Sequence, residues 1–210
     1  MTEEKQRAII LLSGGVDSAV TATAFHEDGM LVVDEGRIVD VGPAATIAAS
    51  LADDTAVEDL GGKLILPGFI DCHVHYSQLD IIAAYGEQLL DWLHRYAYPE
   101  EARFADAGHA AEVADAFLDE LLRNGVTTAN VFATVHPQSV DAIFEAAGKR
   151  GMRLVAGKVL MDRNAPAELL DSAESAYVDS HRLIERWHGR GRLGRGLHRR
   201  RVRLRDRGGR

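Results

Sequence analysis

The chain has 210 residues and a net charge of −8, and its content of 46% hydrophobic and 27% charged residues is typical of a folded domain. Its longest aliphatic runs are too short to cross a bilayer, and its first residues lack the cationic and apolar regions of a secretory signal. A single cysteine, Cys72, excludes an intramolecular disulfide and a Cys-x-x-Cys zinc site, and it favours a reducing, cytoplasmic location away from membranes.

A predicted strand at residues 7–12 leads into a glycine-rich turn, and a predicted helix begins after the turn. Such an arrangement can bind phosphate, because free backbone N–H groups point at the anion. The turn, S-G-G-V-D-S, resembles the pyrophosphate loop of ATP pyrophosphatases, and this resemblance implies an alternative function in ATP binding through Ser13, Gly14, Gly15, Asp17 and Ser18. The resemblance is confined to residues 6–24, so we assign residues 1–25 to an atypical N-terminal segment.

Residues 26–67 predict a small β-rich module. Apolar strands at 30–33 and 37–41 flank Asp34-Glu35-Gly36, a connection typical of a hairpin. A short helix is expected within 43–52, and two more strands within 56–60 and 63–66.

The most informative stretch is L-P-G-F-I-D-C-H-V-H, at residues 66–75. Side chains alternate between the two faces of a strand, so we expect Asp71, His73 and His75 on one face and Cys72 on the other, in a core position. Neutral imidazole is a common ligand of Zn²⁺. Two histidines on one face at the end of a strand therefore predict half of a metal site.

Strands and helices alternate from residue 69 onward. The predicted strands and helices lie, in chain order, at 69–74, 89–93 (a short helix), 109–124 (helix), 126–133, 140–148 (helix), 152–160 and 167–187 (helix). Val113, Phe117 and Leu121 form an apolar stripe, Gly125 ends that helix, and Ser139 is expected to cap the next one. The alternation implies an α/β fold with a parallel sheet, either a barrel or a doubly wound sheet.

The end of the chain differs in charge from the rest. Residues 189–210 contain ten arginines and one aspartate, whereas residues 1–188 carry a charge of −17. An arginine-rich segment attracts nucleic acid, but this one has no aromatic residue on which a base can stack. We therefore expect a disordered or aberrant tail over 195–210, with no specific nucleic-acid partner.

Several stretches between residues 28 and 194 resemble the guanine deaminase family of metal-dependent amidohydrolases. The match rests on L-P-G-F-I-D-C-H-V-H-Y-S-Q (66–78), the segment from W-L to Y-P-E-E-A-R-F (92–104), F-A-T-V-H-P-Q-S (132–139) and G-K-V-L-M-D-R-N-A-P (157–166). The P-G-F-I-D-x-H-x-H part of the first motif is typical of the whole superfamily. Gln78 at the end of that motif and the other three segments point to the guanine-specific branch.

This resemblance implies a (β/α)₈ barrel with a small β-sandwich and an active site at the carboxyl ends of the strands. It implies that His73 and His75 bind Zn²⁺, and that guanine is hydrolysed to xanthine and ammonia by a homo-oligomer. It also implies a substrate segment made of His75, Tyr76, Ser77 and Gln78. Such a barrel takes ~250 residues, so we expect residues 68–194 to form an incomplete one, of about three strand–helix units and with little or no activity.

Other candidate residues have plain structural explanations. We expect His94 and His109 at the surface and Asp162 in loop structure. His136 follows a strand end and is a candidate to face the site, while Trp92 either borders the substrate pocket or packs in the core.

Overall fold

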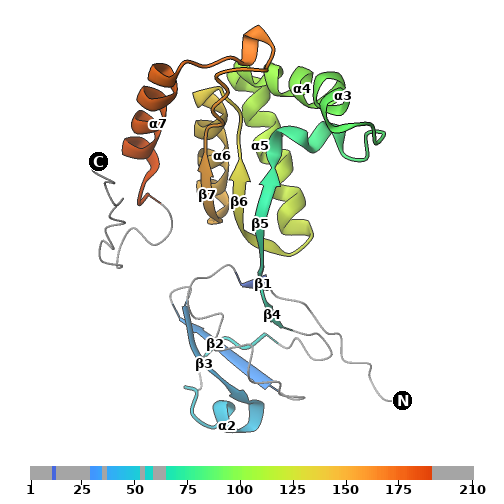
Figure 1. Ribbon diagram of the computed structural model, residues 1–210. Coiled ribbons are helices and arrows are strands. Elements are labelled where there is room, and N and C mark those ends of the chain that lie inside the picture. The colour runs from blue at the N-terminus through green and yellow to red at the C-terminus, as the bar shows by residue number, and fades with distance from the viewer. Residues whose placement is uncertain (1–10, 13–28, 35–36, 53–54, 59–64, 191–210) are drawn as a thin grey trace, which may run out of the picture.

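The computed structural model describes residues 11–12, 29–34, 37–52, 55–58 and 65–190, which form a three-stranded α/β unit and a smaller β module (Figure 1). The pyrophosphate-loop residues and the arginine-rich tail lie outside the described residues. The sheet of the larger unit has the order β5-β6-β7, and both of its strand pairs are parallel. These strands are β5 (Phe69–His75), β6 (Val126–Phe132) and β7 (Arg153–Gly157).

Helices follow each strand, as the predicted α/β alternation requires. After β5 come the 3₁₀ turn η1 (Tyr76–Ile81), then α3 (Leu89–Trp92), the π-helical turn η2 (Leu93–Ala97), α4 (Tyr98–Ala102), the 3₁₀ turn η3 (Arg103–Ala105) and α5 (Ala107–Arg123). After β6 comes α6 (Pro137–Arg150), and after β7 come the 3₁₀ turn η4 (Ala167–Leu169) and α7 (Ala173–Trp187). None of the helices in the described ranges is long and apolar enough to cross a membrane.

Helix α5 confirms the prediction made from its apolar stripe. Asp106 caps its first turn by accepting a hydrogen bond from the N–H of His109 at 2.7 Å. Phe117 and Leu118 are buried in the core, and Gly125 ends the helix with a φ of +80°, where a residue with a Cβ would be strained.

Helices α6 and α7 start at other residues than expected. Helix α6 begins at Pro137, so Ser139 is buried inside its first turn instead of capping it. There the Ser139 hydroxyl donates to the carbonyl of His136 at 2.7 Å. Helix α7 begins only at Ala173, because Ser172 forms a reciprocal cap with Ser175.

The core lies between the sheet and helices α5 and α6 (Figure 1). Its largest fully buried side chains include Tyr76, Phe104, Leu118 and Ile143. Strands β5 and β7 form the edges of the sheet, and Ile70 and Val155, one on each edge strand, are 66% and 64% exposed. The described unit therefore has a core on one side and open edges, which agrees with the expected incomplete barrel.

The close packing of two strands explains why the P-G-F motif has a glycine at position 68. Gly68 connects β4 (Leu66–Pro67) to β5, and a Cβ built at this position would lie 2.0 Å from Oγ1 of Thr127 on β6. Only glycine allows these two neighbouring strands to come so close.

The small module contains the predicted hairpin, made of β2 (Gly29–Asp34) and β3 (Arg37–Pro43), and the predicted short helix, α2 (Ala44–Ala48). Strand β1 (Leu11–Leu12), at the end of the predicted strand 7–12, pairs in parallel with β4. Residues 55–58, which overlap an expected strand, are not in one.

Candidate metal and purine site

Strand β5 brings two imidazoles together at its carboxyl end. The Nε2 atoms of His73 and His75 lie 3.2 Å apart, and their ring centroids lie 5.2 Å apart. The backbone N–H of His73 donates to Oδ1 of Asp71 at 3.0 Å, so this carboxylate lies next to the pair. The two histidines thus lie side by side on one face of β5, as the strand pattern predicts, and their Nε2 atoms approach one another.

The spacing of the two nitrogens fits a shared zinc ion. Two histidine nitrogens bound to one tetrahedral Zn²⁺, each at its usual bond length, would be about 3.3 Å apart. The separation of 3.2 Å between the Nε2 atoms of His73 and His75 is close to this value. Among the residues that the structure describes, no group of three or more His, Cys, Asp or Glu side chains could hold a metal. The described residues therefore supply two ligands.

The environment of His75 favours the neutral imidazole that binds metals. Burial lowers its pKa, and the neighbouring His73 lowers it further. Its Nδ1 atom is buried and has no hydrogen-bond partner among the described residues. Phe132 of β6 stacks on the His75 ring with a centroid distance of 4.7 Å and an interplanar angle of 10°.

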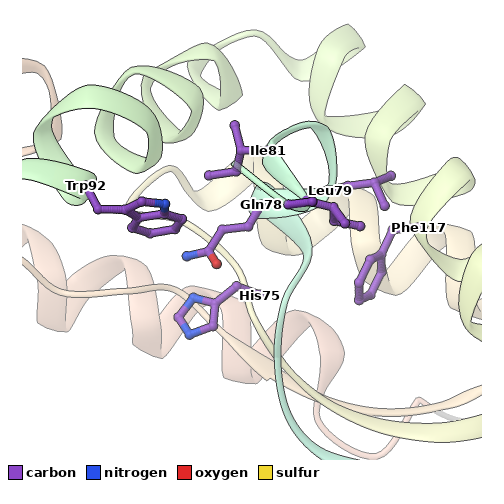
Figure 2. Close-up of a pocket in the computed structure, with 8 residues that line it drawn as sticks. His75, Gln78, Leu79, Ile81, Trp92 and Phe117 are labelled. Atoms are coloured by element: carbon purple, nitrogen blue, oxygen red, sulfur yellow. The ribbon is translucent and has the colours of Figure 1, made fainter. Parts of the chain in front are cut away.

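A cavity of about 300 Å³ opens beside the histidine pair. It is lined by His75, Gln78, Leu79, Ile81, Ile82, Ala83, Trp92 and Phe117. Figure 2 shows the Gln78 amide between the His75 ring and the Trp92 indole. A side-chain amide offers both a donor and an acceptor. Polar groups of this kind in an otherwise mostly apolar cavity can bind the edge of a flat heterocycle.

The 3₁₀ turn η1 explains why Gln78 reaches the cavity and its two neighbours do not. A 3₁₀ helix has three residues per turn, so a side chain three residues after His75 returns to the same side. Tyr76 and Ser77, expected in the substrate segment, are instead 0% and 1% exposed in the core. The Tyr76 hydroxyl donates to the carbonyl of Ser139 at 2.6 Å, and burial raises the pKa of this phenol above its usual value.

The Amidohydrolase family matches this chain over residues 64–198. The chain belongs to the amidohydrolase family. The histidine pair of β5 and the cavity beside it lie within the matched region.

Individual members of the amidohydrolase family resemble the chain closely. Guanine deaminase of Escherichia coli (strain K12) is 51% identical over 177 residues, which are 84% of this chain and 40% of that relative. A solved structure of E. coli guanine deaminase, 43% identical, has a TM-score of 0.73 and covers 89% of this chain and 43% of that one. The chain thus spans well under half of the relative's length. The likeness confirms that the described unit is part of an amidohydrolase barrel.

Two further solved structures that resemble the chain carry ligands. Guanine deaminase from C. acetobutylicum, with guanine bound in its active site, is 29% identical with a TM-score of 0.63, over 78% of this chain and 39% of that one. An adenosine deaminase from Xanthomonas campestris with bound zinc is 21% identical with a TM-score of 0.60, over 77% of this chain and 35% of that one. The second of these likenesses shows the shared fold alone.

Two expectations about single residues of this amidohydrolase are corrected by the structure. Cys72, expected in the core, is exposed, because it lies on the edge strand β5. His109, expected at the surface, has a side chain that is only 14% exposed. Its ring packs edge-on against Phe104 with a centroid distance of 4.9 Å.

The structure places the remaining candidates both inside and outside the cavity. Trp92 borders the cavity. His136 directly precedes α6 and does not line the cavity, so the structure does not support it as a site residue. Its Nε2 atom is buried, and this burial lowers the pKa of the ring, as does the nearby Lys158. His94 is exposed. Asp162 is exposed and paired with Arg163.

Sequence reasoning missed a polar network that includes Asp80 of the turn η1. The Arg103 guanidinium donates to both carboxylate oxygens of Glu100, at 2.7 and 2.9 Å, and reaches Asp80 of η1 at 3.5 Å. The spacing of three residues between Glu100 and Arg103 signals their pairing. No local pattern signals Asp80, which lies 23 residues away from Arg103.

Proposed function

We propose that this chain carries the first-strand zinc ligands and the purine-contacting glutamine of a guanine deaminase, which hydrolyses guanine to xanthine and ammonia. The observation that supports this most strongly is the cavity in which Gln78 lies beside the histidine pair. This arrangement occurs in a chain that is 51% identical to a guanine deaminase over 84% of this chain's length.

Each of these residues has a distinct task in the proposal. His73 and His75 hold the zinc ion through their facing Nε2 atoms. When bound, zinc would make water nucleophilic near neutral pH. Gln78 presents its amide to the purine edge, where an oxygen acceptor and an N–H donor are needed together. The apolar wall that includes Trp92 and Phe117 keeps water away from the flat faces of the base.

The residues described here bind and orient the substrate but do not complete the reaction. The cavity lining contains no carboxylate among the described residues that could carry a proton to the leaving ammonia. We therefore expect the 210-residue chain to bind guanine with very low turnover. A cytoplasmic location and a homo-oligomeric state stay predictions.

Binding of guanine can be measured through Trp92, because the only other tryptophan, Trp187, is stacked on Phe144 of α6, away from the cavity lining. In a Trp187→Phe background, we expect guanine to quench the fluorescence of Trp92. Gln78→Leu should weaken this binding at least tenfold, since buried polar groups of the purine would lose their partner. Quenching by adenine as strong as by guanine, or no effect of Gln78→Leu, would refute the proposal.

A further inference from the structure

The ring of Phe132 contacts both metal-ligand candidates, His73 and His75. Phe132 is the last residue of β6, and it lies directly across from His75 in the parallel pairing of β5 and β6. Its ring centroid is 4.7 Å from that of His75 and also 4.7 Å from that of His73, with interplanar angles of 10° and 36°. One phenyl ring therefore contacts two imidazoles.

On the β7 side of Phe132, the paired residue is a glycine with open space above it. In the pairing of β6 and β7, Phe132 lies across from Gly157. A Cβ added to Gly157 would meet no atom within 4 Å, so the Phe132 ring does not extend over β7. The ring lies over the histidines of β5 instead.

Metal-bound histidines are usually oriented by a hydrogen bond from the second ring nitrogen to a carboxylate or carbonyl. In this chain Nδ1 of His75 is buried without such a partner among the described residues. The contact that the structure offers in its place is the aromatic one. Stacked rings prefer a defined relative orientation, so the phenyl ring restricts rotation of both imidazoles.

We propose that Phe132 is a positioning residue, whose ring holds His73 and His75 in the rotamers that turn their Nε2 atoms toward each other. This inference rests on the proposed function, in which the pair binds zinc. The Phe132 side chain has no metal-ligating atom and does not line the cavity. Because the Phe132 ring already restricts the imidazoles in the free chain, they lose less rotamer freedom when a metal binds.

The test compares three variants of the full chain. Phe132→Leu removes the aromatic ring, Phe132→Tyr keeps it, and Phe144→Leu removes a phenyl ring that stacks on Trp187 at a centroid distance of 5.3 Å, away from the histidine pair. Zinc affinity is measured by calorimetry with a competing chelator. We expect Phe132→Leu to weaken zinc binding about tenfold or more, as outer contacts of metal ligands do. Phe132→Tyr and Phe144→Leu should bind zinc like the unaltered chain.

A second readout needs no metal. In the unaltered chain the Phe132 ring current should shift the imidazole proton resonances of His75 upfield, and this shift should disappear in Phe132→Leu but not in Phe144→Leu. Unchanged zinc affinity and unchanged histidine resonances in Phe132→Leu would overturn the inference. Equal zinc binding by His73→Ala would instead refute the proposed function, while the resonances still decide whether Phe132 orients the pair.

Discussion

The Tyr76 hydroxyl donates to the backbone carbonyl of Ser139 at 2.6 Å and so connects the turn η1 to the first turn of α6. Tyr76 immediately follows the metal-ligand candidate His75, and Gln78 lies two residues further along the same turn. Because Tyr76 is fully buried, this hydrogen bond fixes the direction in which the turn leaves β5. The position of Gln78 in the cavity therefore depends on a contact made outside the cavity.

Replacing Tyr76 by phenylalanine keeps the ring in the core and removes only the hydroxyl. We expect the free energy of unfolding to fall by about 1–2 kcal/mol, because one carbonyl of α6 loses a buried partner. We also expect guanine binding, measured through Trp92, to weaken. Urea titration and fluorescence titration of the same protein give both values. An unchanged stability together with unchanged binding would show that the contact does not fix the turn.

Gly68→Ala tests the close approach of β4–β5 to β6. The added methyl group would lie 2.0 Å from Oγ1 of Thr127, so one of the strands must shift. We expect a loss of about 1–3 kcal/mol in the free energy of unfolding, the usual cost of overpacking. Gly86→Ala is the control, since a Cβ there meets nothing within 4 Å. Equal stability of the two variants would contradict the packing argument.

The pH dependence of stability should contain a contribution from Glu101. Glu101 is only 8% exposed, and this burial raises the pKa of its carboxyl to about 7. Between about pH 4.5 and 7 the folded chain therefore binds more protons at Glu101 than the unfolded chain does. The free energy of unfolding must fall as the pH rises through this range.

Glu101→Gln removes this titration. We expect the variant to be more stable than the unaltered chain at pH 8, by on the order of 2–3 kcal/mol, and to show little difference at pH 4.5. Glu112→Gln, a substitution at an exposed position of α5, should change neither value. Unfolding curves of the three proteins at both pH values measure the effect. A difference for Glu101→Gln that is the same at both pH values would argue against it.

The buried ion pair of Lys158 and Asp171 secures the long connection after β7. The two side chains are 1% and 10% exposed, and Asp171 also accepts a hydrogen bond from Ser175 in the cap of α7. Asp171→Ala leaves the buried ammonium without its partner, so we expect a loss of about 3 kcal/mol in the free energy of unfolding. Asp162→Ala breaks an exposed pair with Arg163 and serves as the control, with no measurable change. Similar losses in both variants would show that the burial of Lys158 has no special role.

Local sequence patterns predicted the parts of the structure that depend on local interactions. The apolar stripe of Val113, Phe117 and Leu121 predicted the helix α5, and the glycine at 125 predicted its end. Alternation along β5 predicted that His73 and His75 lie side by side on one face of the strand. The small hairpin followed from its short glycine-containing connection.

The contacts that were not predicted depend on where the local pattern changes or on pairing between distant segments. Strand alternation ends at His75, and the 3₁₀ turn that follows sends Tyr76 and Ser77 into the core while returning Gln78 to the cavity. The stacking of Phe132 on the histidine pair depends on the register between β5 and β6. This register pairs two segments that lie far apart in the sequence, and no single stretch of sequence reveals it.

The most direct measurement of the central claim is a zinc titration of the full chain and of its His73→Ala/His75→Ala variant under the same conditions. The proposed site predicts that the unaltered chain binds one more equivalent of Zn²⁺ than the double variant, through two histidine nitrogens that are already 3.2 Å apart. The same stoichiometry and affinity in both proteins would contradict the claim that this pair is half of a zinc site.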